Sequence, residues 1–165
     1  LETAPLEIDS LLSRIVWQFE KTYPSHNFET DFPDEHLTLQ VDSGKFEQVM
    51  ENLLNNAIKY SPVGSTLSVS SKVLDREVRI CVEDNGVGMT AEDLRRVFDK
   101  FYRCGATADI SNGMGMGLTI TKEIVDAHGG RIWLNSVYGE GTRVYVSLPL
   151  AEKAGGGETL ESKGD

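Results

Sequence analysis

The stretch Ser43–Tyr60, SGKFEQVMENLLNNAIKY, decides the fold of this chain. Its apolar residues recur at helical spacing, which predicts an amphipathic helix with one buried stripe. The stripe consists of Phe46, Val49, Met50, Leu53, Leu54, Ala57 and Ile58. At about 100° per residue, Asn52, Asn56 and Lys59 fall together beside the stripe, so we expect them to line a cleft at the edge of the core. The run Ser61-Pro62-Val63-Gly64 then ends the helix.

The polar face of this helix suggests a site for a cation and a phosphate. Amide oxygens are hard, neutral ligands, and Mg²⁺ in proteins takes one or two protein ligands and completes its shell with water and phosphate oxygens. Asn52, Asn56 and the Lys59 ammonium supply such groups on one wall. The helix alone leaves the alternative open that Asn52, Asn55, Asn56 and Lys59 are simply a solvated face.

Outward from this helix, the pattern alternates between helical and strand periods. Leu6–Tyr23 has helical spacing, and Asn27–Phe32 and Leu37–Val41 have the alternation of two short strands separated by a turn. On the other side, Leu67–Val73 and Val78–Val82 alternate around Asp75-Arg76, which predicts an antiparallel hairpin with one buried face.

The second half of the chain continues this alternation. Thr90 is a typical N-cap residue, and the acidic residues after it predict the first turn of a helix. Residues 103–113 show no periodicity, which predicts a loop. A helix opening near Gly115 is expected to stop at Gly129-Gly130, and Ile132–Leu148 predicts a final hairpin. Helices on one face of a mixed, mostly antiparallel sheet make an α+β two-layer sandwich the expected fold class.

Composition bounds the class of protein. The chain has 165 residues, 39% hydrophobic and 25% charged, which predicts one folded domain over 1–150 and a disordered Gly-rich tail over 151–165. Cys81 and Cys104 form no disulfide framework, which favours a reducing, intracellular setting. The N-terminus carries neither an initiator Met nor a signal-peptide pattern, so we expect a mature or excised fragment.

The charge balance limits the partners. With 16 Lys and Arg against 26 Asp and Glu, the formal net charge is -10, which disfavours nonspecific binding to nucleic acid or to an anionic membrane. To bind an anionic ligand, the protein therefore needs local groups that attract it, such as backbone amides, a metal ion or a few Lys and Arg side chains at the site.

Asp84-Asn85-Gly86-Val87-Gly88-Met89 stands at the end of a predicted strand. Its two glycines allow a tight turn and a close approach of a ligand to the backbone, and Asp84 offers an acceptor to an amino group. A plain Asn-Gly turn is the alternative at this point.

Gly113-Met114-Gly115-Met116-Gly117-Leu118 opens a predicted helix directly after the irregular loop. Backbone amides freed by alternate glycines, together with the helix dipole, form an anion site suited to phosphates. A further glycine pair, in Gly139-Glu140-Gly141-Thr142, lies in the last hairpin, where by itself it indicates a structural turn.

Five segments, in this order and at these separations, resemble the catalytic and ATP-binding domain of bacterial sensor histidine kinases, within the gyrase, heat-shock chaperone, histidine kinase and mismatch-repair ATPase superfamily. They are NLLNNAIKYS (52–61), DNGVGM (84–89), VFDKFYR (97–103), GMGMGLTITKEIVDAHGG (113–130) and GEGT (139–142). They are similar to the N box, the G1 box, the F box, the G2 box with its helix, and the last glycine box. The resemblance implies a Bergerat-type sandwich that holds ATP between the helix 43–60 and a flexible lid.

The resemblance also implies a role for single residues. Asp84 would accept from the adenine amino group with Thr142 supporting it through water, and Asn56 would be the Mg²⁺ ligand with Asn52 as its neighbour. Lys59 and Arg103 would reach the phosphates. The other implied nucleotide-binding residues are Tyr60, Gly86 and Gly88 at the base, Phe98 and Phe101 as lid anchors, and Gly113, Gly115, Gly117 and Leu118 around the triphosphate.

By this resemblance the chain is a protein-histidine kinase catalytic domain that binds Mg-ATP. It would donate the γ-phosphate to a histidine on a separate dimerisation domain of the same parent protein, which in turn serves a response regulator. Hydrolytic members of the superfamily have a Glu where this chain has Asn52, and a neutral amide cannot act as a general base. ATP is therefore expected to be held for transfer and not hydrolysed.

The phosphoacceptor itself is expected to be absent. None of His26, His36 and His128 stands in the family's His-Glu or His-Asp context, and structural roles are favoured for all three. The fragment is expected to be a cytoplasmic monomer, either free or as part of a membrane-bound sensor. The alternative function is a nucleotide-responsive binding module without phosphotransfer.

Overall fold

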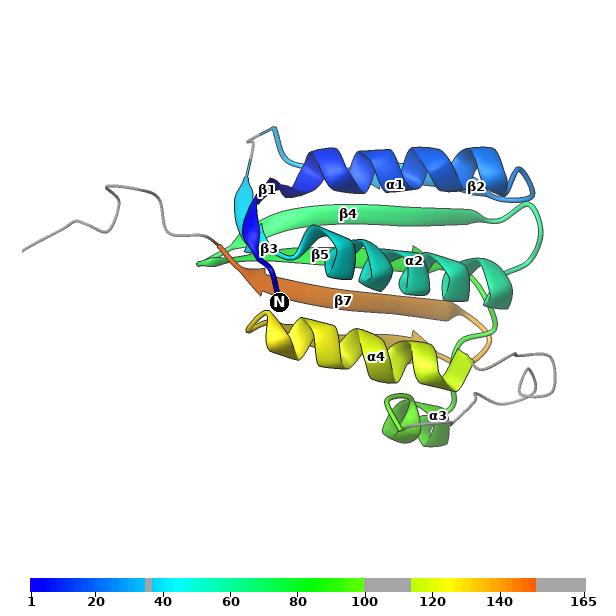
Figure 1. Ribbon diagram of the computed structural model, residues 1–165. Helices are drawn as coiled ribbons and strands as arrows, with labels where there is room; N and C mark the ends of the chain where they lie inside the picture. The colour runs from blue at the N-terminus through cyan, green and yellow to red at the C-terminus, as the bar shows by residue number, and fades with distance from the viewer. Residues whose placement is uncertain (35–36, 100–113, 151–165) are drawn as a thin grey trace, which may run out of the picture.

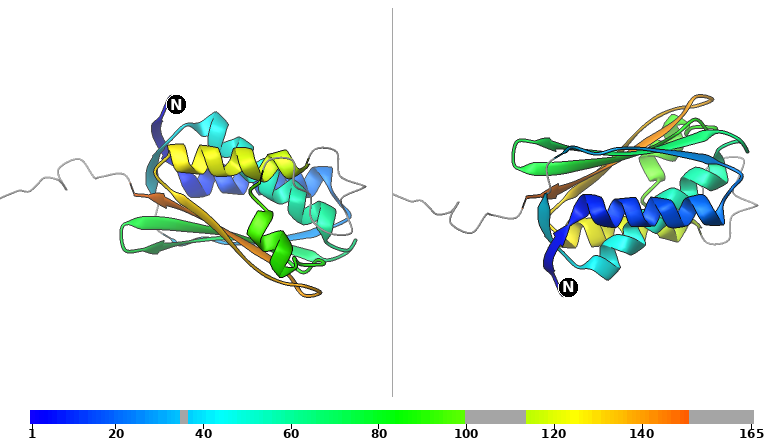
Figure 2. Two further views of the ribbon diagram at one scale, coloured as in Figure 1. Left: turned by 90° about the horizontal axis from the view of Figure 1, so that it is seen from below. Right: turned by 90° about the horizontal axis from the view of Figure 1, so that it is seen from above.

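The computed structural model describes residues 1–34, 37–99 and 114–150. It contains two layers, a five-stranded sheet and a set of helices that cover one of its faces (Figures 1 and 2). In chain order the elements are β1 (Ala4–Glu7), α1 (Ile8–Thr22), β2 (Asn27–Asp31), β3 (Thr38–Val41), α2 (Ser43–Tyr60), β4 (Thr66–Leu74), β5 (Glu77–Asp84), α3 (Ala91–Arg96), α4 (Met114–Ala127), β6 (Arg131–Val137) and β7 (Gly141–Pro149). The predicted α+β sandwich is confirmed.

The sheet is mixed, with the strand order β2-β4-β5-β7-β6. Only the edge pair β2 and β4 is parallel, and the other three pairs are antiparallel, as expected. The strands predicted over 27–32 and 37–41 both form, but they belong to different sheets. β3 pairs with β1, a four-residue strand that the sequence analysis missed because it began the first helix at Leu6, whereas α1 begins at Ile8.

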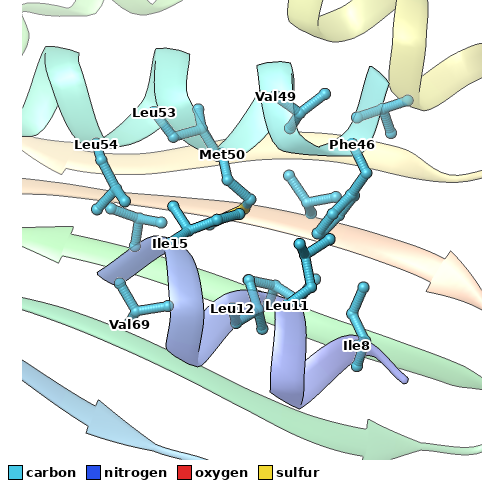
Figure 3. Packing of buried hydrophobic residues seen from close by; sticks show 14 of the residues in the cluster. Ile8, Leu11, Leu12, Ile15, Phe46, Val49, Met50, Leu53, Leu54 and Val69 are labelled. Atoms are coloured by element: carbon cyan, nitrogen blue, oxygen red, sulfur yellow. The ribbon is translucent and has the colours of Figure 1, made fainter. Parts of the chain in front are cut away.

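The core lies between the sheet and the helices. α1 and α2 each turn one apolar stripe inward, and their side chains meet over the sheet (Figure 3). Phe46, Met50 and Leu54 of α2 are at most 2% exposed, in contact with a layer that includes Leu12 and Ile15 of α1. Burial of this kind stabilises a fold by roughly 1.5–3 kcal/mol for each large apolar side chain.

Capping residues and a glycine mark the ends of the helices. The Asp42 side chain caps α2 by accepting from the Lys45 N–H at 3.1 Å, and Thr90 and Asp93 form a reciprocal capping box at the start of α3. α4 ends at Ala127, shortly before Gly129, which adopts a φ of 76°, as the Gly129-Gly130 pair predicted.

These elements bring four chain segments to one end of the molecule. The end of α2, the end of β5, the start of β7 and the start of α4 lie together there (Figure 1). The predicted site residues come from these four segments and from the segment after α3. Residues 35–36, 100–113 and 151–165 lie outside the description, and with them the predicted tail.

Candidate functional site

The C-terminal end of α2 is joined directly to the loop that follows β5. The backbone N–H of Val87 donates to the carbonyl of Tyr60 at 3.1 Å. At Gly86, a Cβ would lie 2.1 Å from that same Tyr60 oxygen, so only glycine allows the approach. The Asn-Gly sequence is thus more than a turn, because it fixes the end of α2 against the sheet.

Asp84 occupies the centre of this junction. Its side chain is 9% exposed, and its Oδ1 accepts from the Gly86 N–H at 2.7 Å. Burial raises the pKa of the carboxyl above its ordinary value, while the backbone amides of Gly86 and Thr142 act in the opposite direction. A buried carboxylate held by backbone donors is a rigid acceptor for a polar N–H of a ligand.

The turn between β6 and β7 closes this end of the site. Gly141 has a φ of 123°, and a Cβ there would lie 2.2 Å from the Asp84 carbonyl oxygen. Gly88, with a φ of 72°, approaches the carbonyl of Val137 as closely. The two glycines therefore bring the DNGVG loop and the last hairpin into backbone contact.

Ser136 ties these parts together, and the sequence analysis missed it. Its Oγ accepts from the Met89 N–H at 2.7 Å, donates to the Gly141 carbonyl at 3.0 Å and lies 2.8 Å from Thr142 Oγ1. Because the single Ser136 proton is used by Gly141, the Thr142 hydroxyl donates to Ser136. The register that pairs Ser136 with Thr142 is the signal that could have found it.

Four polar side chains of α2 bear on the predicted cation site. Asn52, Asn55, Asn56 and Lys59 are all half-buried. Asn55 contacts α1 through the Tyr23 hydroxyl at 3.4 Å, and Asn52 Nδ2 donates to Thr121 Oγ1 of α4 at 3.2 Å. Asn56 differs from both, because its Oδ1 is buried and has no hydrogen-bond partner among the described residues.

An unpaired buried acceptor is costly unless something outside the chain satisfies it. An amide oxygen is a suitable ligand for Mg²⁺, and Asn56 Oδ1 therefore fits a cation whose remaining ligands are water and phosphate oxygens. No group of three or more His, Cys, Asp or Glu able to hold a metal occurs in the described parts of the chain. A metal here would thus depend on amide oxygens and on the ligand itself.

The start of α4 supplies the other wall. Gly115 and Gly117 lie in its first turn, and Leu118 is 7% exposed in the hydrophobic core. Thr119 Oγ1 donates to the carbonyl of Phe98 at 3.0 Å, which ties α4 to the segment after α3. Phe98 is half-buried against the core.

The remaining predicted site residues are not placed. Phe101, Arg103 and Gly113 lie outside the described residues and stay predictions.

The described histidines have structural hydrogen bonds. His26 is 7% exposed and contacts the Ser25 hydroxyl at 2.9 Å. His128 uses both ring nitrogens: Nε2 accepts from the Asp42 N–H at 3.0 Å, and Nδ1 lies 2.8 Å from the Ile124 carbonyl. A backbone N–H on Nε2 fixes the proton on Nδ1, so neither nitrogen of His128 is free to react. His36 lies outside the described residues.

A surface cavity of about 690 Å³ lies at the opposite end of β5 from Asp84. Arg76, Gly130 and Pro149 are among its lining residues, and it shares none with the predicted site. In the described parts of the chain, no helix has both the length and the apolar character to cross a membrane.

Comparison with known proteins agrees with this geometry. The family model of the histidine kinase-, DNA gyrase B- and HSP90-like ATPases matches residues 41–152. The sensor histidine kinase WalK of Bacillus subtilis is 40% identical over 152 residues, which cover 90% of this chain and 25% of that protein. The sensor protein kinase WalK of Staphylococcus saprophyticus is 35% identical over 147 residues, 87% of this chain and 24% of that protein. The chain thus spans about a quarter of these relatives.

Solved structures confirm the fold. The catalytic domain of the histidine kinase ThkA superposes with a TM-score of 0.80 at 24% identity, over 91% of this chain and 99% of that one. A mycobacterial sensor histidine kinase, MprB, gives 0.77 at 24% identity, over 90% and 97%. Because the family match includes more than half of the chain, the chain belongs to the histidine kinase-, DNA gyrase B- and HSP90-like ATPases.

Proposed function

We propose that residues 1–150 bind ATP with Mg²⁺ and donate its γ-phosphate to a histidine on a separate dimerisation domain of the same parent protein. One observation carries the proposal. The buried carboxylate of Asp84 is joined through Gly86 to the end of α2, where Asn56 has a buried Oδ1 with no hydrogen-bond partner in the described parts of the chain. One group is an acceptor suited to a base, the other an oxygen suited to a cation, and both lie at the same end of the molecule.

The adenine is assigned to the Asp84 end. The carboxylate accepts from the exocyclic amino group, and the Thr142 hydroxyl supports the base through a water molecule. Gly86 and Gly88 let the loop backbone approach the ring, and Tyr60 lies at the end of the α2 helix beside them. A hydrogen bond to an ionised acceptor contributes about 1.5–3 kcal/mol, so Asp84 is the main determinant of base binding.

The phosphates are assigned to the space between α2 and α4. Asn56 Oδ1 would hold Mg²⁺ with Asn52 as its neighbour, and Lys59 and Arg103 would reach the phosphate oxygens. When bound, Mg²⁺ neutralises charge on the phosphates and so favours phosphoryl transfer. The first turn of α4 contains Gly115 and Gly117, and its free backbone N–H groups would bind the phosphates. Because the net charge of the chain is -10, these local positive groups are needed to bind the phosphates.

Asn52 is the reason why ATP is expected to persist in the site. An amide cannot take a proton from water as a carboxylate base would, so hydrolysis is slow and the γ-phosphate waits for a nucleophile. Both ring nitrogens of His128 have hydrogen-bond partners and His26 is buried, which argues against either of these two described histidines as the acceptor. A response regulator would receive the phosphate afterwards. We further propose that the domain is monomeric and cytoplasmic.

Calorimetric titration of ATP with and without Mg²⁺ is the first test. One-to-one binding that Mg²⁺ strengthens is expected, and no binding at millimolar ATP contradicts the proposal. The second test adds the histidine-bearing dimerisation domain in trans with labelled ATP. An acid-labile phosphohistidine on that domain supports the kinase, whereas nucleotide binding that docks the domain without transfer supports a binding module instead.

A further inference from the structure

Thr121 of α4 is a hydroxyl-bearing residue at a position where the fold needs only an apolar side chain. It is 0% exposed, and α4 packs against α2 at this point. Valine has nearly the same shape and carries no polar atom. Burying a hydroxyl is destabilising unless it is hydrogen-bonded, so its hydrogen bonds explain the choice. One partner is Asn52, whose Nδ2 donates to Thr121 Oγ1 at 3.2 Å.

The direction of this hydrogen bond follows from the chemistry of a threonine in a helix. Such a threonine ordinarily gives its hydroxyl proton to a carbonyl about one turn earlier in its own helix. The lone pairs of Oγ1 remain, and they accept from an N–H. Asn52 therefore turns its amide nitrogen, and not its oxygen, to α4.

The orientation matters because the two ends of an amide have opposite polarity. The oxygen attracts a cation, while the NH₂ group repels it, and a rotation of about 180° exchanges them with little change in shape. Asn52 and Asn56 lie one turn apart on the same face of α2. Because Nδ2 of Asn52 points to Thr121, Oδ1 is the amide atom turned away from α4, on the helix face that also carries Asn56, whose Oδ1 has no hydrogen-bond partner among the described residues.

We infer that Thr121 is a positioning residue that fixes the Asn52 amide so that two oxygens, and no NH₂ group, face the Mg²⁺ of bound ATP. This inference rests on the proposed function. Thr121 contacts neither nucleotide nor metal, and it acts through Asn52. It also connects α4, whose glycine-rich first turn is proposed to bind the phosphates, to α2, which carries the proposed Mg²⁺ ligand Asn56.

Three variants test this. Thr121→Val removes the hydroxyl and keeps the shape, and Thr121→Ser keeps the hydroxyl. Ser71→Ala is the matched control, because Ser71 is 8% exposed and its hydroxyl donates to Asp9 Oδ1 at 2.9 Å, a similar inter-element bond on the α1 side of the core.

Two quantities are measured for each protein. The first needs no ligand: the side-chain amide NMR signals of Asn52 and their hydrogen-exchange rate. The second is the Mg²⁺ enhancement, the ratio of ATP dissociation constants without and with Mg²⁺.

In Thr121→Val, the Asn52 amide signals are expected to shift and exchange faster, and the Mg²⁺ enhancement to fall about tenfold, as the loss of one hydrogen bond predicts. ATP affinity without Mg²⁺ stays within about twofold. Thr121→Ser restores both quantities, and Ser71→Ala lowers stability without changing either.

An unchanged enhancement in Thr121→Val, or an equal loss in Thr121→Ser, overturns the inference while the proposed function stands. If the wild-type chain binds no ATP under either condition, the proposed function is wrong, and the metal role of Asn52 with it. Unchanged Asn52 signals in Thr121→Val overturn the positioning role without any reference to nucleotide.

Discussion

Asp84 accepts a 2.7 Å hydrogen bond from the backbone N–H of Gly86, two residues further along the chain. This contact holds the carboxylate at the end of β5 in a fixed orientation, and the residue is only 9% exposed. The burial that suits the carboxylate to a ligand also raises its pKa, because an ionised group is poorly solvated there. Function and stability therefore make opposite demands on this residue.

Asp84→Asn is expected to separate these demands. The amide oxygen still accepts from Gly86, but the buried charge is gone. The free energy of unfolding at neutral pH should therefore rise. ATP affinity should fall by about 1–3 kcal/mol, since a neutral acceptor is weaker and an amide can present the wrong group. Urea unfolding and calorimetry measure the two quantities. A less stable protein with unchanged ATP affinity would remove Asp84 from the site.

The raised pKa of Asp84 predicts the pH dependence of that stability difference. A carboxyl with a higher pKa in the folded than in the unfolded state stabilises the fold when protonated, fully below the ordinary value of 3.8. This contribution is lost as the pH rises through the folded-state pKa. The stability advantage of Asp84→Asn over the wild type should therefore be largest at neutral pH and shrink on acidification.

Urea unfolding of the two proteins in parallel, from about pH 7 to pH 4, measures this difference. All other carboxylates are common to both proteins and cancel. A difference that stays constant with pH would show that the Asp84 carboxyl titrates as an exposed group does.

Gly86→Ala tests the junction between α2 and the loop after β5. Its Cβ would lie 2.1 Å from the Tyr60 carbonyl, so α2 or the loop must move, and we expect a loss of about 1–3 kcal/mol of stability together with weaker ATP binding. Gly44→Ala, near the other end of α2, is the matched control. A Cβ there meets only Asp42 Oδ1 at 3.7 Å, so that change should be neutral or slightly stabilising. Equal effects of the two substitutions would contradict this reading.

The thiol of Cys81 gives a prediction outside the site. Burial raises its pKa to about 11, so the reactive thiolate is scarce at neutral pH. In a Cys104→Ser background, alkylation of Cys81 should be slow at neutral pH and accelerate about tenfold for each pH unit. The urea-unfolded chain is the control and should react at the rate of an ordinary cysteine. Fast alkylation of the folded protein would show that burial does not raise the pKa of the Cys81 thiol.

Features that depend on local sequence were predictable. α2 begins and ends where its apolar period and Pro62 place it, and Asp84 ends the second strand of its hairpin. Each signal lies within one element, and the physical cause acts over a few residues. The order of the glycine-rich segments then predicted which ends of the elements carry the site.

Features that depend on pairing between distant elements were not predictable. β1 and β2 are short and mostly exposed, so their partners, β3 and β4, are set by tertiary packing and not by their own pattern. The contact between Thr121 and Asn52 requires the packing of α4 on α2. The role of Ser136 requires the register of the last hairpin, which alternation alone leaves open.

Ser136→Ala is expected to lower ATP affinity although Ser136 has no contact in the proposed nucleotide site. Its hydroxyl accepts the proton of Thr142 Oγ1 and so fixes which way the Thr142 lone pairs face. Removing it should cost about 0.5–1.5 kcal/mol of ATP binding, close to the effect of Thr142→Val. Because Ser136 acts through Thr142, the double variant should bind ATP no more weakly than Thr142→Val alone. Ser70→Ala, a half-buried strand serine of β4, should leave affinity unchanged. Additive losses in the double variant would mean that Ser136 acts through the Met89 backbone instead.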